Sequence, residues 1–239
     1  MKHAAEIINE RDNIMPGMKK ARQKKDLGIT GSMAKWYDKN TRKSRLAEMK
    51  EYAEIVNENV KSGAKVLEVA PGPGYLSIEL AKYGFDVTGV EISADFVEIE
   101  KRNAVESGVN VNFKQGNASS LPLPDGAFDF IICSAAFKNF SEPLKALNEM
   151  HRVLKPEGIA LILDMNHDAT KDDIEAEMTK SGMKGFDRWF VKLSFKTFLK
   201  SGAYTKDGFV ELISQTGFTS NKIVQHGIGF QVWLYKENA

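Results

Sequence analysis

The sequence predicts an α/β protein built around a doubly wound, mostly parallel sheet. From Ala64 onward, short runs rich in β-branched residues alternate with helix-like segments, and repeated strand–helix–strand units form right-handed crossovers. The first run leads directly into a glycine-rich turn over residues 70–74. Near the C-terminus the last two runs lie too close together for a parallel crossover. The spacing therefore predicts a parallel sheet that is closed by one antiparallel strand.

Five strands form the parallel part of the predicted sheet. Each is a short apolar or β-branched run bounded by glycine, proline or polar residues, a pattern typical of strands that are buried on both faces. The predicted strands cover residues 65–69, 86–90, 109–114, 128–133 and 158–164.

The helices between these strands carry their own start and stop signals. A glycine just beyond the last turn can adopt the left-handed conformation that ends a helix, and Gly84 and Gly108 stand at such positions. Ser93 can cap the second helix, and Pro156 follows the third. The predicted helices cover residues 75–83, 94–106 and 142–154.

The last third of the chain departs from this alternation. After the fifth strand, the polar residues 166–173 precede a helix, an aromatic segment over 186–198 and a second helix before the hairpin. We expect residues 166–206 to form a cap inserted into the core. The late helices are predicted over 174–181 and 205–216, and the hairpin strands over 221–225 and 230–235.

The chain divides into two predicted parts. Residues 1–55 are mostly polar and helical, with a break at 27–32, and we expect them to form an N-terminal extension that acts as a lid. Residues 56–239 form the core domain, including the cap insertion.

Charge is distributed unevenly between these parts. Residues 1–50 hold 13 Lys or Arg and 6 Asp or Glu, a local charge of +7, whereas the rest of the chain holds 20 and 26, a charge of −6. A basic segment of this kind can attract an anionic partner such as RNA, or it can simply be a solvated helix face. Both interpretations stay open at this point.

Composition excludes several classes of protein. With 42% apolar and 27% charged residues, the 239-residue chain is typical of a folded globular protein and not of a disordered one. The single Cys133 cannot form an internal disulfide, and no Cys or His spacing is typical of a metal site. No apolar run approaches the ~20 residues of a membrane-spanning helix, and no signal core precedes the first helix. We therefore expect a cytoplasmic protein without a metal.

The glycine-rich turn and a later acid together predict a nucleotide site. Glycines at a strand-to-helix turn let a ligand approach the backbone, and Glu91 ends the second strand, where a carboxylate can accept hydrogen bonds from ribose hydroxyls. A dinucleotide site would need a third glycine where Ser77 stands. Glu68, beside the turn, would repel a diphosphate but suits a ligand that carries an ammonium group. These residues disfavour NAD.

Residues 68–74, Glu-Val-Ala-Pro-Gly-Pro-Gly, resemble the first motif of the class I S-adenosylmethionine-dependent methyltransferases, with Ala70 in place of the motif's first glycine. The nearest branch is similar to small-molecule and quinone-biosynthesis methyltransferases. The resemblance covers roughly residues 33–164 and implies a Rossmann-like sheet of seven strands in the order 3-2-1-4-5-7-6, with the last strand antiparallel. Further matching motifs lie at residues 115–118, 125–137 and 150–158.

The resemblance implies S-adenosylmethionine as cofactor and assigns its contacts residue by residue. Glu91 matches the family's ribose-binding acid, and Asn117 stands where the family usually has an Asp that grips adenine. This replacement weakens the expected bond to the adenine amino group. The implied cofactor contacts are Tyr37, Glu68, Ala70, Gly72, Gly74, Glu91, Ile92, Asn117, Ala118 and Ser134.

Methyl transfer from a sulfonium is an in-line displacement that needs alignment and exclusion of water, so no catalytic triad is expected. His167, just past the fifth strand, is the first candidate for a general base, although it can equally be a solvated loop histidine beside Asp168. Cys133 is better interpreted as a small buried side chain than as a nucleophile.

Aromatic residues outside the motifs predict an acceptor pocket. Trp36 and Tyr37 resemble an aromatic pair with which relatives cover the cofactor, and core packing is the alternative. The aromatic segment 186–198 either caps this pocket or packs as an ordinary amphipathic helix. The predicted pocket residues are Trp36, Asn139, Phe140, Phe186, Trp189 and Phe190.

The sequence thus predicts methyl transfer to a small-molecule acceptor, with no membrane partner and with nucleic acid an unfavoured one. Two alternatives remain: an RNA methyltransferase that uses the basic N-terminal segment, and a cofactor-binding protein without turnover.

Overall fold

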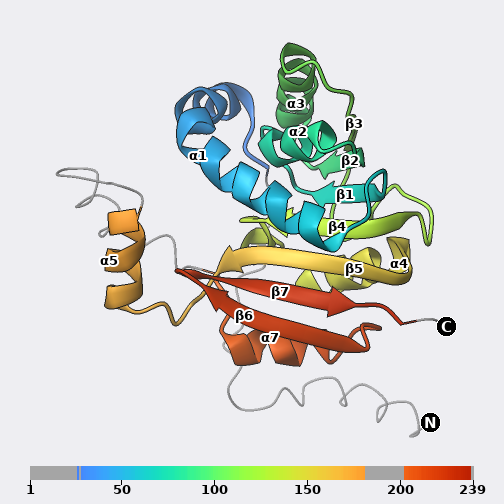
Figure 1. The fold of residues 1–239 in the computed structure, drawn as a ribbon, viewed down its shortest axis with the longest axis vertical. Coiled ribbons are helices and arrows are strands. Elements are labelled where there is room, and N and C mark those ends of the chain that lie inside the picture. The colour runs from blue at the N-terminus through green and yellow to red at the C-terminus, as the bar shows by residue number, and fades with distance from the viewer. Residues whose placement is uncertain (1–25, 27, 181–201, 238–239) are drawn as a thin grey trace, which may run out of the picture.

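The computed structural model describes Asp26, residues 28–180 and residues 202–237. Its sheet has the strand order β3-β2-β1-β4-β5-β7-β6, and β7 runs antiparallel to both of its neighbours, which confirms the predicted order and class (Figure 1). The strands are β1 (Lys65–Val69), β2 (Asp86–Glu91), β3 (Asn112–Gln115), β4 (Phe128–Ser134), β5 (Leu154–Met165), β6 (Ser220–His226) and β7 (Gly229–Tyr235).

Helices cover both faces of the sheet. The helices α1, α2 and α3 pack on one face, and α4 and α7 pack on the other (Figure 1). No helix in the described ranges is long and apolar enough to cross a membrane. The helices are α1 (Gly31–Asn59), α2 (Tyr75–Lys82), α3 (Ala94–Glu106), the short 3-10 helix η1 (Phe137–Asn139), α4 (Pro143–Val153), α5 (Lys171–Lys180) and α7 (Lys206–Ile213).

Alternate residues of the central strands supply two hydrophobic cores. In β1, Val66 packs with α1 and α2, whereas Leu67 packs with α4 and α7 on the opposite face. Cys133 in β4 is fully buried in the second of these cores, in agreement with its interpretation as a packing residue. Because both faces are covered, the central strands β1 and β4 are mostly apolar and buried.

Most element boundaries follow the predicted signals. Ser93 caps α3 by accepting a hydrogen bond from the backbone N–H of Phe96, and Gly84 follows α2 with a φ of 86°. Two strands begin three or more residues away from their predicted starts. β3 starts three residues late because the N–H of Val109 still bonds to the last turn of α3, and β5 starts early, at Leu154, with a register shift against β4.

The described part of the N-terminal extension is mainly one helix, α1, which is docked on the sheet. Its buried residues are separated by three, four or eleven positions, each close to a whole number of helical turns, so one stripe of α1 faces the core. The helix runs continuously past residue 55, where we expected the core domain to begin, and ends at Asn59. The buried stripe consists of Ala34, Asp38, Met49, Ala53 and Val56.

The hairpin is built as predicted, since His226 pairs with Gly229 across a two-residue turn in which Gly227 has a φ of 56°. Of the predicted cap, α5 belongs to the described residues. The aromatic part of the cap lies outside them.

Candidate functional site

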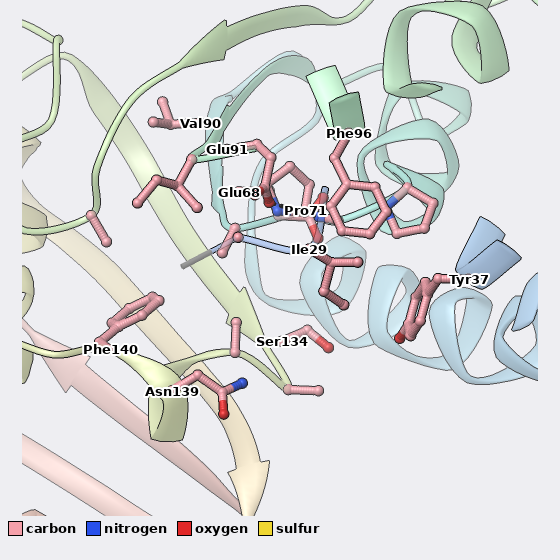
Figure 2. Close-up of a pocket in the computed structure, with 18 of the residues that line it drawn as sticks. Ile29, Tyr37, Glu68, Pro71, Val90, Glu91, Phe96, Ser134, Asn139 and Phe140 are labelled. Atoms are coloured by element: carbon pink, nitrogen blue, oxygen red, sulfur yellow. Dashed lines mark hydrogen bonds between the residues drawn. The ribbon is translucent and has the colours of Figure 1, made fainter. Parts of the chain in front are cut away.

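A cavity of about 340 Å³ opens at the carboxyl ends of β1, β2 and β4 (Figure 2). Doubly wound sheets bind ligands at this edge, and the volume suits a small molecule. Its walls combine apolar side chains with carboxylate and amide groups. The lining brings together eleven predicted site residues: Tyr37, Glu68, Ala70, Gly72, Glu91, Ile92, Asn117, Ala118, Ser134, Asn139 and Phe140.

The glycine-rich turn forms the floor of this cavity. Ala70, Gly72 and Gly74 all have positive φ angles, of 58°, 60° and 80°. The turn is closed by a hydrogen bond from the N–H of Gly74 to the carbonyl of Pro71. A Cβ on Gly74 would lie 3.1 Å from Phe113 and from Glu100, so this glycine is needed for close packing behind the turn and does not itself line the cavity.

Glu91 lies at the end of β2 with its carboxylate in the cavity wall. One oxygen accepts a hydrogen bond from the N–H of Ser93 at 2.9 Å, and the other accepts from the N–H of Gly72 at 3.2 Å. Burial raises the pKa of Glu91, although these two bonds favour the ionised form. The carboxylate is therefore fixed against the turn, and its remaining lone pairs are available to a ligand.

Glu68 is almost completely buried beneath the turn. The hydroxyl of Ser77 donates a hydrogen bond to its carboxylate, so the serine that replaced the third glycine of a dinucleotide motif holds this acid in place. Burial raises the pKa of Glu68 to about 7, and the nearby charge of Glu91 acts in the same direction. A cationic ligand would favour its ionised form.

Two polar groups lie at the other end of the cavity. Asn117 accepts a hydrogen bond from the N–H of Ser119 and donates one to Asp26, while Ile92 and Ala118 provide apolar wall beside it. Across the cavity, the buried hydroxyl of Ser134 has no hydrogen-bond partner among the described residues.

Helix α1 supplies the remaining wall. Tyr37, Arg45 and Met49 line the cavity from this helix, and the ring of Tyr37 packs edge-on against Phe96 of α3. Figure 2 shows Tyr37 facing the cavity from the side opposite Phe140. The Arg45 guanidinium also pairs with Glu48 at 3.0 Å, which keeps it at the cavity edge.

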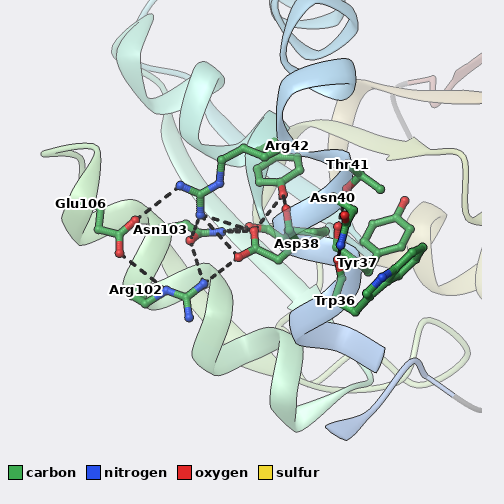
Figure 3. Close-up of polar contacts among 11 residues, drawn as sticks. Trp36, Tyr37, Asp38, Asn40, Thr41, Arg42, Arg102, Asn103 and Glu106 are labelled. Atoms are coloured by element: carbon green, nitrogen blue, oxygen red, sulfur yellow. Dashed lines mark hydrogen bonds and ion pairs between the residues drawn. The ribbon is translucent and has the colours of Figure 1, made fainter. Parts of the chain in front are cut away.

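A buried polar cluster holds α1 against α3 and the turn (Figure 3). Asp38 accepts hydrogen bonds from the hydroxyl of Tyr75 at 2.7 Å, from the amide of Asn103 at 3.1 Å and from Arg102 at 2.7 Å. The same Asn103 amide donates to the carbonyl of Pro73. Burial opposes ionisation of Asp38, but its hydrogen-bond donors outweigh burial and hold its pKa below the usual value.

Several predicted site residues lie elsewhere. His167 is exposed on the loop after β5, with Nδ1 2.9 Å from Asp168, and it does not line the cavity. Trp36 is 59% exposed and does not line the cavity. Phe186, Trp189 and Phe190 lie outside the described residues.

Three charged residues of the site were missed by sequence reasoning. Asp26 and Arg45 line the cavity, and Asp38 anchors the helix that carries Arg45. All three lie in the N-terminal extension, where sequence reasoning considered the summed charge and not the individual charged residues. The position of Asp38 on the apolar stripe of α1 is a signal that could have identified it, because a carboxylate on a buried face needs partners.

Comparisons with known proteins agree with this geometry. Residues 67–162 match the family described as the methyltransferase domain. The chain is 40% identical to the uncharacterized methyltransferase YcgJ of Bacillus subtilis over 46% of its length, and 36% identical to a demethylmenaquinone methyltransferase of Thermus thermophilus over 44%. It spans 43% and 48% of those two relatives, so less than half of each is matched.

The whole fold is shared more widely. A methyltransferase structure from Aquifex aeolicus superposes with a TM-score of 0.66 at 23% identity, over 87% of this chain and 99% of that one. Strand order, cavity position, motif residues and the family match agree. Residues 67–162 therefore form a methyltransferase domain, and the chain has the fold of S-adenosylmethionine-dependent methyltransferases.

Proposed function

We propose that this protein transfers a methyl group from S-adenosylmethionine to a small-molecule acceptor. The observation that carries the proposal is the cavity in which the glycine-rich turn, Glu91 and Asn117 converge. When bound, S-adenosylmethionine supplies an electrophilic methyl group on a sulfonium.

The polar, charged and apolar groups that line the cavity fit this cofactor. Glu91 is in position to accept hydrogen bonds from ribose hydroxyls, and Ile92 and Ala118 offer apolar wall for adenine. Glu68 adds negative potential beneath the turn, which suits a ligand with an ammonium and a sulfonium. The guanidinium of Arg45 at the cavity edge suits the amino-acid carboxylate.

In the reaction, the residues of this chain align the two reactants and exclude water. Alignment alone can supply ~7 kcal/mol or more of rate enhancement. Tyr37 from α1, together with Asn139 and Phe140 from the loop after β4, would position the acceptor opposite the turn. Because His167 is outside the cavity lining, no histidine of the described residues is available there as a base, so an acceptor that ionises readily is favoured.

The acceptor we propose is small and partly apolar, of the phenol, thiol or quinone-precursor kind. Phe140, Met49 and Ile29 give the cavity an apolar side, and the charge of −6 beyond residue 50 would repel a phosphate backbone. The demethylmenaquinone methyltransferase among the relatives is consistent with a quinone-type acceptor.

Transfer of a labelled methyl group tests the proposal. The protein is incubated with methyl-labelled S-adenosylmethionine and either a panel of phenols, thiols and quinone precursors or total RNA. We expect label in at least one small molecule and none in RNA. Near-stoichiometric methylation of RNA would replace the proposal with the RNA alternative. Tight cofactor binding without transfer in either arm would favour the non-catalytic alternative.

A further inference from the structure

Asp26 connects two loops of the cavity rim. Its Oδ2 accepts a hydrogen bond from the amide nitrogen of Asn117 at 3.0 Å, and its Oδ1 accepts from the backbone N–H of Ser141 at 2.9 Å. Asp26 is half-buried and lines the cavity. Neither loop lies near residue 26 in sequence, so this carboxylate reaches the site from outside the core.

Gly28, Ile29 and Gly31 are held in place by contacts that do not involve the side chain of Asp26. A Cβ on Gly28 would lie 2.9 Å from the Cβ of Ser93, so the chain passes directly over the loop between β2 and α3. The hydroxyl of Ser93 donates to the carbonyl of Ile29 at 2.6 Å, and the N–H of Gly31 donates to Asp95 at 2.9 Å. These contacts hold residues 28–31 against the loop between β2 and α3, within a few positions of Asp26.

The hydrogen bonds of Asp26 and Asn117 show which of their donor and acceptor groups are left for a ligand. The N–H of Ser119 can only donate, so the oxygen of Asn117 faces Ser119 and its nitrogen faces Asp26. That amide uses one hydrogen for Asp26 and keeps a second. The hydrogen bonds from Ser141 and Asn117 outweigh burial and hold the pKa of Asp26 below its usual value, so Asp26 is a carboxylate that can only accept.

The pair therefore presents an acceptor beside a donor on one cavity wall. The edge of adenine presents the complementary arrangement, an amino donor beside a ring-nitrogen acceptor. We propose, on the basis of the proposed function, that Asp26 accepts the hydrogen bond of the adenine amino group. It thereby supplies, from the N-terminal segment, the carboxylate that the family usually carries at position 117, where this chain has Asn117.

Calorimetric titration with S-adenosylhomocysteine tests the proposal. Asp26→Ala and Asp26→Asn should each weaken binding by about 10-fold or more, the size expected for a hydrogen bond to a charged group. The exchange variant Asp26→Asn/Asn117→Asp keeps one carboxylate and one amide in the pair, so it should recover most of the loss. Glu98→Gln, which neutralises an exposed acid on α3, is the matched control and should bind like the wild type.

A base analogue separates direct recognition from a structural role. S-Inosylhomocysteine carries a carbonyl oxygen in place of the amino group, so the wild type should bind it at least about 10-fold more weakly than S-adenosylhomocysteine. Asp26→Ala should bind the two ligands within about 3-fold of each other. A variant that loses affinity for both ligands equally would overturn the proposal and leave Asp26 a structural residue.

The outcomes distinguish this inference from the proposed function. If the wild type binds S-adenosylhomocysteine and Asp26→Ala binds it equally well, the inference fails and the proposed function stands. If the wild type binds neither ligand, the proposed function fails and the inference fails with it.

Discussion

Ala70 holds a left-handed backbone conformation at the first position of the turn, where the family pattern has glycine. A Cβ in this conformation costs roughly 1–2 kcal/mol, whereas glycine costs about 0.5–1 kcal/mol more than alanine in chain entropy. We therefore expect Ala70→Gly to raise the free energy of unfolding by about 0.5–1 kcal/mol, measured by urea denaturation. Ala47→Gly, in the exposed part of α1, should instead lower it by about 1 kcal/mol. A destabilising Ala70→Gly would show that the turn is not strained at this residue.

Glu100 is the most strongly perturbed acid of the described residues. It is fully buried behind the turn, and both of its oxygens lack a hydrogen-bond partner within the described part of the chain. Burial raises its pKa to about 10, and the charges of Glu91 and Glu68 add to this effect. The folded protein thus keeps a proton that the unfolded chain releases near the ordinary glutamate pKa of 4.5. Its contribution to stability is complete at acidic pH and falls as the pH rises from about 4.5 toward 10.

The substitution Glu100→Gln should remove the pH dependence of stability that comes from this buried acid. The amide resembles the protonated acid but releases no proton on unfolding, so the variant should be more stable than the wild type at pH 7, by up to about 3 kcal/mol. The two proteins should have equal stability near pH 4. Thermal unfolding between pH 4 and 8 measures the difference, with Glu98→Gln on the exposed face of α3 as control. Equal stability at pH 8 would mean that Glu100 is ionised in the folded state.

At the scale of elements, α1 depends on one side chain for its orientation. Asp38 bonds to Tyr75, Asn103 and Arg102, and so joins α1 to α2 and α3. Asp38→Ala would leave these donors without their shared acceptor and should lower the free energy of unfolding by about 2–4 kcal/mol. Hydrogen exchange should rise along α1, and cofactor affinity should fall because Tyr37 and Arg45 lie on this helix.

The control for Asp38 is Glu54→Ala, which removes an exposed acid from the same helix. It should leave both stability and exchange close to those of the wild type. Unchanged exchange in Asp38→Ala would contradict the anchoring role, since α1 would then be held by its apolar stripe alone.

The parallel core was predictable because its signals are local. Each strand is a short apolar run, and each helix end has a nearby cap or stop residue, such as Ser93 or Gly84. The docking of α1 was not predictable in the same way. Its apolar stripe is narrow and includes Asp38. From sequence alone the helix therefore looks polar, because the residues on other helices that pair with Asp38 are not known.

At the scale of the whole molecule, some site residues could be predicted from a local motif, and others could not because they are distant in sequence. The turn and Glu91 lie within one strand–helix–strand unit, and the sequence motif placed them in the cavity lining. Asp26 lies 91 residues from Asn117 and 115 from Ser141, and its role depends on the folded chain bringing them together. His167 was expected at the active edge because it follows β5, but the loop directs it to solvent.

The charge distribution of the molecule predicts how turnover responds to salt. A small, partly apolar acceptor makes few ionic contacts, so turnover should change little between low and moderate salt. An RNA acceptor would bind through Lys and Arg, and its affinity would fall with a logarithmic slope of about −0.7 per phosphate contact. Initial rates measured across a salt series test this prediction. A steep decline would contradict the small-molecule assignment.

The most direct test of the central claim, that the cavity is an S-adenosylmethionine site, is calorimetric titration of the wild type and Glu91→Ala. The wild type should bind S-adenosylmethionine and S-adenosylhomocysteine at a 1:1 ratio. Glu91→Ala should lose about 1.5–3 kcal/mol of binding free energy, as for hydrogen bonds to a charged group. Full-strength binding by Glu91→Ala, or tight binding of NAD by the wild type, would contradict the claim.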